Sequence, residues 1–459
     1  ITPQLRDKIN HFAHFSQTGV SLRQMVMFGQ NPSQGTLMRA TQFLADELPI
    51  RIAHRIKELE ELPHNLSEMP SIIKVKNWYA QSFEELITFP KAELPSNIRE
   101  RISSSSVIQK LPDSIPHPAN NPAHSGILKQ SIPIGRRYYT KIDDVNNWPP
   151  EVQYYNEKFT KLIQVIKARH NPVVTTVVTQ GVLEYKQQRA KTVIDTDIQA
   201  FLDRFYMSRI GIRMLIGQHV ALNQPSSRSD YVGIICTKTN IAQAVQEAAD
   251  NAKCICEEYY GLFRAPEVQL YCSDNLLFTY VPTHLSHMLF ELLKNSLRAV
   301  VEKFGEVDEY PPIKVIVAEG KEDITIKISD EGGGIPRSNI PLVWTYMYST
   351  AQPQKLDPEF NQTDFRAPMA GFGYGLPISR LYARYFGGDL KLISMEGYDT
   401  LGSNMYNESA KRDIFAQTLT IAELSLLKVS EFPITCGSTN QHMIRDDDFL
   451  RSRNGLIKM

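Results

Sequence analysis

The sequence is poor in cysteine and has no excess of charge of either sign. Only five of its 459 residues are cysteine, and an odd, scattered set does not predict a disulfide framework. Lysine plus arginine and aspartate plus glutamate both number 50, for a formal net charge of +0. Nothing therefore indicates wholesale binding to nucleic acid or to an anionic membrane. No apolar run reaches the roughly 18 residues that a membrane-crossing helix needs.

Cys254 and Cys256 form an isolated Cys-x-Cys pair. Tetrahedral zinc needs four ligands, and neither a second pair nor a nearby histidine accompanies these two. Reduced, buried thiols are therefore favoured over a metal site. The chain opens on Ile1 rather than methionine, so the absence of a targeting peptide excludes no compartment.

The amino-terminal part of the chain predicts helices. Apolar residues recur there at three- and four-residue spacing, which is typical of one buried helix face. The segments with this pattern are 1–100, 151–168 and 195–222. Together they predict an antiparallel four-helix bundle over 1–222. A serine- and proline-rich stretch at 103–134 interrupts the pattern and predicts a mobile insertion, with a functional docking loop as the alternative.

A mixed pattern of strands and helices begins after a predicted linker at 223–230. The expected strands are 231–236, 268–271, 276–280, 313–318 and 324–329, and the expected helices are 241–260 and 284–304. We expect the second and third strands to pair, Thr283 to cap the second helix and Gly305 to end it. The pattern predicts an α/β sandwich domain over 231–400.

The second of these helices has one face rich in polar groups. His287, Glu291 and Asn295 follow one another at four-residue intervals, which places them in line. Lys294 and Arg298 lie beside that line. A solvated face explains the lysine and the glutamate, but it does not explain the asparagine, which is a mediocre helix former. Alone, this pattern is weak evidence of a site.

A first glycine-rich segment comes directly after the strand that ends on Asp330. Gly332 and Gly334 follow it, and glycine permits a tight turn and the close approach of a ligand to the backbone. An ionised aspartate accepts hydrogen bonds, so it suits an amino donor such as the exocyclic nitrogen of adenine. An ordinary turn between a strand and a loop is the alternative.

A second glycine-rich segment, at 371–376, opens an apolar helix. The G-x-G-x-G pattern there offers free backbone N–H groups to an anion at the positive end of the helix dipole. It is neither the Rossmann fingerprint nor a Walker A loop, because the spacing and the residues that follow differ. A lone glycine triplet is weak evidence, but the three segments in this order are strong evidence.

The polar helix and the two glycine segments resemble the nucleotide-binding motifs of an ATPase fold. Gyrase, the Hsp90-type chaperones, the sensor histidine kinases and the mismatch-repair ATPases share that fold. Within it, the chain resembles the mitochondrial dehydrogenase kinases over about residues 1–400, apart from the insertion. The similar segments are 205–209, 213–215, 287–298, 347–351 and 371–383. The resemblance implies a helical bundle followed by an α/β sandwich ATPase domain.

The resemblance also implies roles for single residues. Asn295 would bind Mg²⁺, Glu291 would be the general base on a substrate serine, and His287 would tune it. Asp330 would bind adenine. The other residues expected at ATP are Glu291, Lys294, Arg298, Gly332, Gly334, Ser349, Thr350, Gly371, Phe372, Gly373, Tyr374, Gly375 and Leu376. The last six would end a mobile lid at about 346–368. This agrees with phosphoryl transfer, which needs a metal and positioning more than covalent chemistry.

Other functions within the superfamily compete with a protein kinase. A sensor histidine kinase has an acidic residue after its phosphoacceptor histidine, and none of the eleven histidines is followed by Asp or Glu. A non-kinase ATPase, such as a clamp or chaperone, would carry a transducer domain after the ATPase, where little chain remains. A degenerate binding module would lose Asn295, Asp330 or the glycines. We therefore expect a protein-serine kinase that uses ATP and Mg²⁺.

The expected substrate is the pyruvate dehydrogenase component of its complex, which phosphorylation would inactivate. Segments 346–350, 371–375 and 385–390 resemble the pyruvate type, whereas 232–237 resembles the branched-chain 2-oxoacid dehydrogenase kinase, which is the alternative. The resemblance further implies binding to the lipoyl domain of the acetyltransferase component, a homodimer and the mitochondrial matrix. It implies no nucleic acid and no membrane span.

The chain departs from the family after residue 397. Thr400 is kept, but Asp399 stands where the family has glycine, and the expected final apolar strand does not follow. We predict an atypical tail over 401–459 that resembles nothing in the family. The last strand and the carboxy-terminal arms, which the family uses to dimerise and to grip lipoyl domains, then have no counterpart in the sequence.

A regulatory pocket for a small carboxylate is the last implication of the resemblance. Tyr79, His170 and Arg213 would line it. Tyr79 could instead be a core residue, and His170 could cap a helix. A buried guanidinium is costly unless it is paired, and Arg213 could be paired by a bound carboxylate or equally well by an internal acidic residue.

Overall fold

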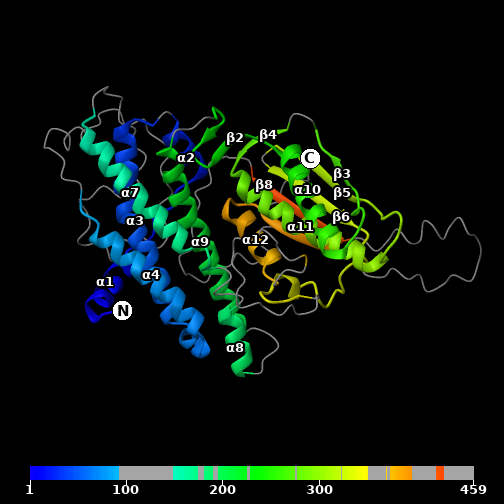
Figure 1. The fold of residues 1–459 in the computed structure, drawn as a ribbon, viewed down its shortest axis with the longest axis horizontal. Helices are drawn as coiled ribbons and strands as arrows, with labels where there is room; N and C mark the ends of the chain where they lie inside the picture. Colours follow the sequence, from blue (N-terminus) through cyan, green and yellow to red (C-terminus); the bar gives the residue numbers. More distant parts are fainter. Residues whose placement is uncertain are drawn as a thin grey trace, which may run out of the picture.

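The structure is a computed structural model with a helical part and an α/β part (Figure 1). It describes residues 1–30, 32–91, 148–173, 180–189, 195–224, 228–273, 276–321, 323–349, 369, 373–394 and 420–427. The predicted insertion at 103–134, part of the predicted linker and most of the predicted tail lie outside these residues.

The helical part contains the predicted four-helix bundle. Its elements are α1 (Pro3–Ala13), α2 (Leu22–Gly29), α3 (Gln34–Glu60), η1 (Pro63–Glu68), α4 (Pro70–Thr88), α7 (Pro150–Arg169), α8 (Val182–Arg189) and α9 (Thr196–Leu222). The bundle consists of α3, α4, α7 and α9, which pack against one another. Ser33 begins α3 by accepting a hydrogen bond from the Thr36 backbone N–H, which satisfies one of the free donors at a helix start.

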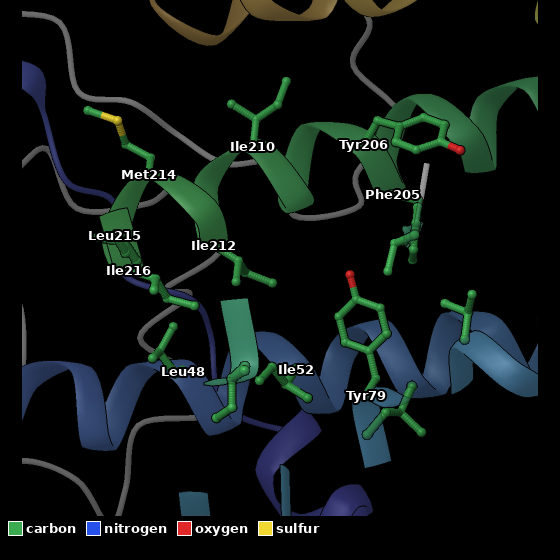
Figure 2. Close-up of a cluster of buried hydrophobic side chains, with 14 of the residues drawn as sticks. Leu48, Ile52, Tyr79, Phe205, Tyr206, Ile210, Ile212, Met214, Leu215 and Ile216 are labelled. Atoms are coloured by element: carbon green, nitrogen blue, oxygen red, sulfur yellow. The ribbon is translucent and has the colours of Figure 1, made fainter. Parts of the chain in front are cut away.

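The core of the bundle lies where the apolar faces of these helices meet. Figure 2 shows Leu48 and Ile52 of α3 on the side of that helix that faces Ile212 and Ile216 of α9. All four side chains are buried, as the three- and four-residue apolar spacing predicted.

The α/β part holds two sheets. Its elements are β1 (Tyr231–Val232), β2 (Ile235–Asn240), α10 (Ile241–Tyr260), β3 (Val268–Tyr271), β4 (Leu277–Tyr280), α11 (Pro282–Phe304), β5 (Ile313–Glu319), β6 (Asp323–Asp330), η4 (Leu342–Trp344), α12 (Gly375–Tyr385), β7 (Asp389–Ser394) and β8 (Thr420–Leu427). The larger sheet has the order β3-β5-β6-β8-β7, and the smaller one has the order β1-β2-β4. Helices α10, α11 and α12 contact the larger sheet, which gives the predicted α/β sandwich.

Two local predictions about this part are wrong. The strands at 268–271 and 276–280 do not pair with each other, because β3 pairs in parallel with β5 and β4 pairs with β2. Thr283 does not cap α11, since the helix begins two residues earlier than expected, at Pro282, and Val281 precedes it. Proline favours the first helical position because its fixed φ suits a helix and its missing N–H would be unpaired there. Gly305 ends α11 as predicted, with φ 65°.

Strand β8 corrects the prediction that no final strand follows residue 400. It lies between β6 and β7, and its register pairs Asp330 with Thr420. Leu424 and Leu426 of β8 are fully buried, at 0% and 1% exposure, so the strand completes the core beneath the helices. The strand begins 20 residues after Thr400.

Helix α12 joins the two parts of the molecule. Ile378, Leu381 and Tyr385 belong to the apolar cluster of the helical part, whereas Ala383 belongs to that of the α/β part. Helix α12 contacts α9 on one side and α11 on the other, as Figure 1 also shows. Helix α9 therefore lies directly against the helix that the second glycine segment opens.

The described helices and cysteines can be compared with what composition predicted. None of the helices in the described ranges has both the length and the apolar character that a membrane crossing requires. Cys236 and Cys256 are buried, as predicted for free thiols, but Cys254 is exposed because the two members of the Cys-x-Cys pair point to different sides of α10.

Candidate functional site

The polar face of α11 forms one wall of the candidate site. Lys294 Nζ lies 3.0 Å from Glu291 Oε1, and both side chains are largely buried, with exposures of 4% and 13%. A buried lysine needs such a partner because an unpaired charge in a low-dielectric environment is costly. Asn295 is half-buried one turn beyond Glu291.

His287 lies one turn before Glu291 on the same helix. Its ring centroid is 5.3 Å from that of Tyr382 on α12. Burial lowers the pKa of His287, and the Glu291 carboxylate partly opposes that effect. The lowered pKa keeps this imidazole neutral at pH 7, one helical turn from the Glu291 carboxylate.

Asp330 lies at the end of β6, where burial is nearly complete at 3% exposure. Its Oδ1 accepts a hydrogen bond of 3.0 Å from the Gly332 backbone N–H. Burial raises the pKa of the Asp330 carboxyl to about 6, although hydrogen bonds from Gly332 and Ser296 oppose the shift. A Cβ at Gly332 would lie 2.8 Å from the Ala299 carbonyl carbon and 2.9 Å from Asp330 Oδ1, so only glycine fits here.

We expect nucleotide affinity to depend on the charge of Asp330. Because its pKa is about 6, the carboxyl is ionised above that pH and gains a proton below it. The affinity for Mg-ADP should then fall about tenfold from pH 7 to pH 5, following the ionised fraction. Calorimetric titration at both pH values checks this.

The control for that prediction is Asp330→Asn. Asparagine keeps an acceptor oxygen but cannot gain or lose a proton in this range. The difference in pH dependence between wild type and variant isolates the carboxyl from the titration of the nucleotide's own phosphates. Identical pH profiles for the two proteins would remove Asp330 from the adenine site.

The second glycine segment meets the polar face of α11 at the start of α12. Gly375 is the first residue of α12, and a Cβ there would collide with the carboxylate of Glu291. The amino end of a helix carries unpaired N–H groups and a partial positive charge. The structure therefore brings the Glu291 carboxylate against the amino end of α12.

Only some of the remaining residues predicted at the nucleotide lie within the described part of the chain. Arg298 pairs with Glu302 at 2.9 Å, and Gly334 has φ 75°, which glycine adopts at little cost. Ser349 is exposed. Tyr374 and Leu376 flank Gly375 and are half-buried. Thr350, Gly371, Phe372 and most of the predicted lid lie outside the described residues.

The donor set fits a magnesium ion that is held mainly by a nucleotide. Within the described ranges, no three or more His, Cys, Asp and Glu side chains are grouped so that they could hold a metal. Magnesium keeps several waters and binds through one or two protein oxygens plus substrate phosphates. The single amide oxygen of Asn295 is a ligand of that kind.

The three residues of the predicted regulatory pocket lie near one another in the bundle. The rings of Tyr79 and His170 are 4.4 Å apart, and Figure 2 shows the Tyr79 hydroxyl directed toward α9. Arg213 of α9 donates a hydrogen bond of 2.9 Å to Asn171 Oδ1. Burial lowers the pKa of His170 to about 3, so this imidazole is neutral.

Sequence reasoning missed Arg209 in this region. Its Nη2 lies 3.4 Å from the carbonyl oxygens of His170 and Asn171. Its Nε is buried and has no hydrogen-bond partner among the described residues. Arg209 stands one helical turn before Arg213, and that spacing on α9 was the signal that could have identified it.

Two family models match parts of this chain. Residues 19–236 match a family model described as mitochondrial branched-chain alpha-ketoacid dehydrogenase kinase. Residues 280–406 match one described as histidine kinase-, DNA gyrase B-, and HSP90-like ATPase. The predicted bundle and ATPase fold are thereby confirmed.

Curated relatives cover most of the chain. The mitochondrial pyruvate dehydrogenase (acetyl-transferring) kinase of Schizosaccharomyces pombe is 49% identical over 408 residues, which are 86% of this chain and 94% of that protein. The kinase of the same name from Arabidopsis thaliana is 43% identical, over 86% of this chain and 92% of that protein. Isozyme 3 from Homo sapiens is 38% identical, over 86% and 83%.

Proposed function

The chain belongs to the family of mitochondrial pyruvate dehydrogenase kinases, and on that premise we propose that it phosphorylates a serine of the pyruvate dehydrogenase component and so inactivates the complex. The observation that carries this is the contact between Glu291 and the start of α12 at Gly375. This proximity supports a role for the Glu291 carboxylate beside the terminal phosphate of ATP and the incoming hydroxyl.

Each group of the site has a task in this transfer. Glu291 accepts the proton of the serine hydroxyl as the oxygen attacks phosphorus. The amino end of α12 and Lys294 hold the negative charge that spreads over the transferred group. Asp330 orients the adenine. Asn295 would hold Mg²⁺, which would supply positive charge to the phosphates.

The test of the function is phosphorylation of purified complexes. The chain is incubated with labelled ATP, Mg²⁺ and either the pyruvate or the branched-chain 2-oxoacid dehydrogenase complex, and phosphosites are then mapped. We expect serine phosphorylation and loss of activity in the pyruvate complex. Labelling of the branched-chain complex alone would transfer the assignment to the alternative substrate, and ATP hydrolysis without labelling would indicate a non-kinase ATPase.

We propose the mitochondrial matrix as the compartment and a homodimer that binds lipoyl domains as the assembly. The support for a dimer is the face of the larger sheet opposite α10–α12. Tyr271, Ile316 and Ile393 point to that face because strand residues alternate, and they are 52%, 45% and 46% exposed. Exposed apolar residues on one sheet face favour burial against another copy.

We also propose that the regulatory pocket binds a small carboxylate such as pyruvate. Arg209 Nε is buried without a hydrogen-bond partner in the described part of the chain. A bound carboxylate would accept a hydrogen bond from it, with Arg213 as the second arginine at the site. His170 is neutral, so the two arginines supply the positive charge.

Arg213→Ala should weaken inhibition by pyruvate or a chlorinated acetate. A hydrogen bond to a charged group contributes about 1.5–3 kcal/mol, so the half-inhibiting concentration should rise about tenfold or more. Kinase assays across a titration measure this. The matched control is Arg228→Ala, which removes an exposed arginine beside Tyr231 and should leave inhibition unchanged. Equal inhibition of wild type and Arg213→Ala would rule the pocket out.

A further inference from the structure

Tyr346 belongs to the α/β part by sequence but is bound by the helical part. It follows η4, is only 2% exposed and lies in the apolar cluster of the bundle. Its hydroxyl donates a hydrogen bond of 2.8 Å to Asp203 Oδ1, and its backbone N–H donates one of 3.0 Å to Gln199 Oε1. The predicted lid was to begin at this residue, yet Tyr346 is fixed on α9.

Both acceptors lie on one face of α9. Gln199 and Asp203 are four residues apart, so their side chains are neighbours on the helix surface. The ring of Tyr206, one turn further, lies 5.6 Å from that of Tyr346. Burial raises the pKa of the Tyr346 hydroxyl well above its usual range, and the Asp203 carboxylate adds to the shift. Tyr346 therefore stays protonated and remains a donor.

The next residue, Met347, connects Tyr346 to the second glycine segment through a backbone hydrogen bond. The Met347 backbone N–H donates a hydrogen bond of 2.9 Å to the Gly373 carbonyl oxygen. Met347 has φ 64°, which is uncommon for a residue with a side chain. Gly373 has φ 75°, and a Cβ there would lie 2.8 Å from the Met347 carbonyl carbon and from Tyr348 N. A side chain at position 373 would therefore clash with the backbone of Met347 and Tyr348.

We propose that Gln199, Asp203 and Tyr346 are positioning residues for phosphate binding. They act through Met347 on Gly373, which lies two residues before the start of α12. This inference rests on the proposed function, because it takes the start of α12 to be the phosphate site. The hydrogen bonds to α9 set the place of Gly373 relative to Glu291 and Lys294.

Two hydrogen bonds are needed because burial of the ring alone does not fix this geometry. Apolar packing is non-directional, and it tolerates rotation of the segment about the Tyr346 side chain. A backbone hydrogen bond to Gln199 and a side-chain hydrogen bond to Asp203 together restrain that rotation. Displacements of about 1 Å at a reacting site can cost about 10²-fold in rate.

The experiment compares Tyr346→Phe with Tyr185→Phe in the full chain. Tyr185 is equally buried, and its hydroxyl donates a hydrogen bond of 2.6 Å to Asp195 Oδ2, just before α9. Each variant loses one buried tyrosine–aspartate hydrogen bond, so their thermal stabilities should fall by similar amounts. Only Tyr346→Phe should bind Mg-ADP more weakly, by about fivefold, the value of one typical hydrogen bond.

Further variants test whether the effect passes through the named acceptors. Gln199→Leu should weaken Mg-ADP binding about as much as Tyr346→Phe, whereas Gln199→Glu keeps an acceptor and should restore most of the affinity. The double variant Asp203→Ala/Tyr346→Phe should bind Mg-ADP no more weakly than either single variant, because both substitutions remove the same hydrogen bond.

The outcomes separate this inference from the proposed function. If the wild type binds Mg-ADP and the two variants Tyr346→Phe and Tyr185→Phe bind it with equal affinity, the positioning role is overturned and the proposed function still stands. Failure of the wild type to bind Mg-ADP would overturn both.

Discussion

Asn295→Ala should abolish the binding of Mg-ATP and leave the fold intact. Asn295 lies one turn after Glu291 on α11, and its side-chain amide carries an oxygen. Magnesium requires oxygen ligands in near-octahedral geometry. Alanine offers none, so we expect affinity to fall by about 10²-fold or more. Calorimetric titration with Mg-ATP measures the change.

The thermal stability of the protein should not fall in this variant. Alanine is a better helix former than asparagine by several tenths of a kcal/mol, and the half-buried Asn295 lies in the middle of α11. Thermal unfolding without nucleotide should therefore show equal or slightly higher stability. Asn251→Ala, an exposed asparagine on α10, is the matched control and should bind normally. Normal ATP affinity in Asn295→Ala would overturn the metal assignment.

Glu291→Gln should reduce turnover by about 10²-fold or more, the usual contribution of a general base. Glutamine keeps the shape of the side chain and an oxygen that can accept the hydrogen bond of Lys294, which spans 3.0 Å in the wild type. It cannot accept the proton of the serine hydroxyl. Single-turnover phosphorylation of the pyruvate complex measures the chemical step separately from product release.

Nucleotide affinity distinguishes a base from a structural residue. If Glu291 acts on the proton, Mg-ADP should bind Glu291→Gln about as tightly as it binds the wild type. Glu247→Gln, an exposed change on α10 that keeps the side chain near Gln243, should have normal turnover. Wild-type turnover by Glu291→Gln would mean that the carboxylate serves only to pair Lys294.

The site was predictable from sequence where its residues lie on one element. The four-residue spacing of His287, Glu291 and Asn295 fixes their common side of α11 because a helix repeats every 3.6 residues. The strand that ends on Asp330 and the turn at Gly332 follow from alternation and from glycine's freedom at a tight turn. These are local consequences of backbone geometry.

Contacts between distant segments needed the tertiary structure. Tyr346 is 143 positions from Asp203, and no spacing rule connects them, because their contact depends on how the segment after η4 packs on α9. The same holds for Arg209 beside His170, and for the assignment of β3 and β4 to different sheets. Strand β8 was missed for a related reason, since its place between β6 and β7 depends on pairing and not on its distance from Thr400.

Periodicity, turn preference and side-chain type are encoded locally, so the sequence was enough to predict the helical bundle, the ATPase-type motifs and the residues proposed to carry the chemistry. The tertiary structure alone decided which of these groups meet. It set Glu291 against the start of α12 at Gly375 and bound Tyr346 to α9. The physical reason is that such contacts arise from the packing of whole elements into a shared core, which links residues far apart in the chain.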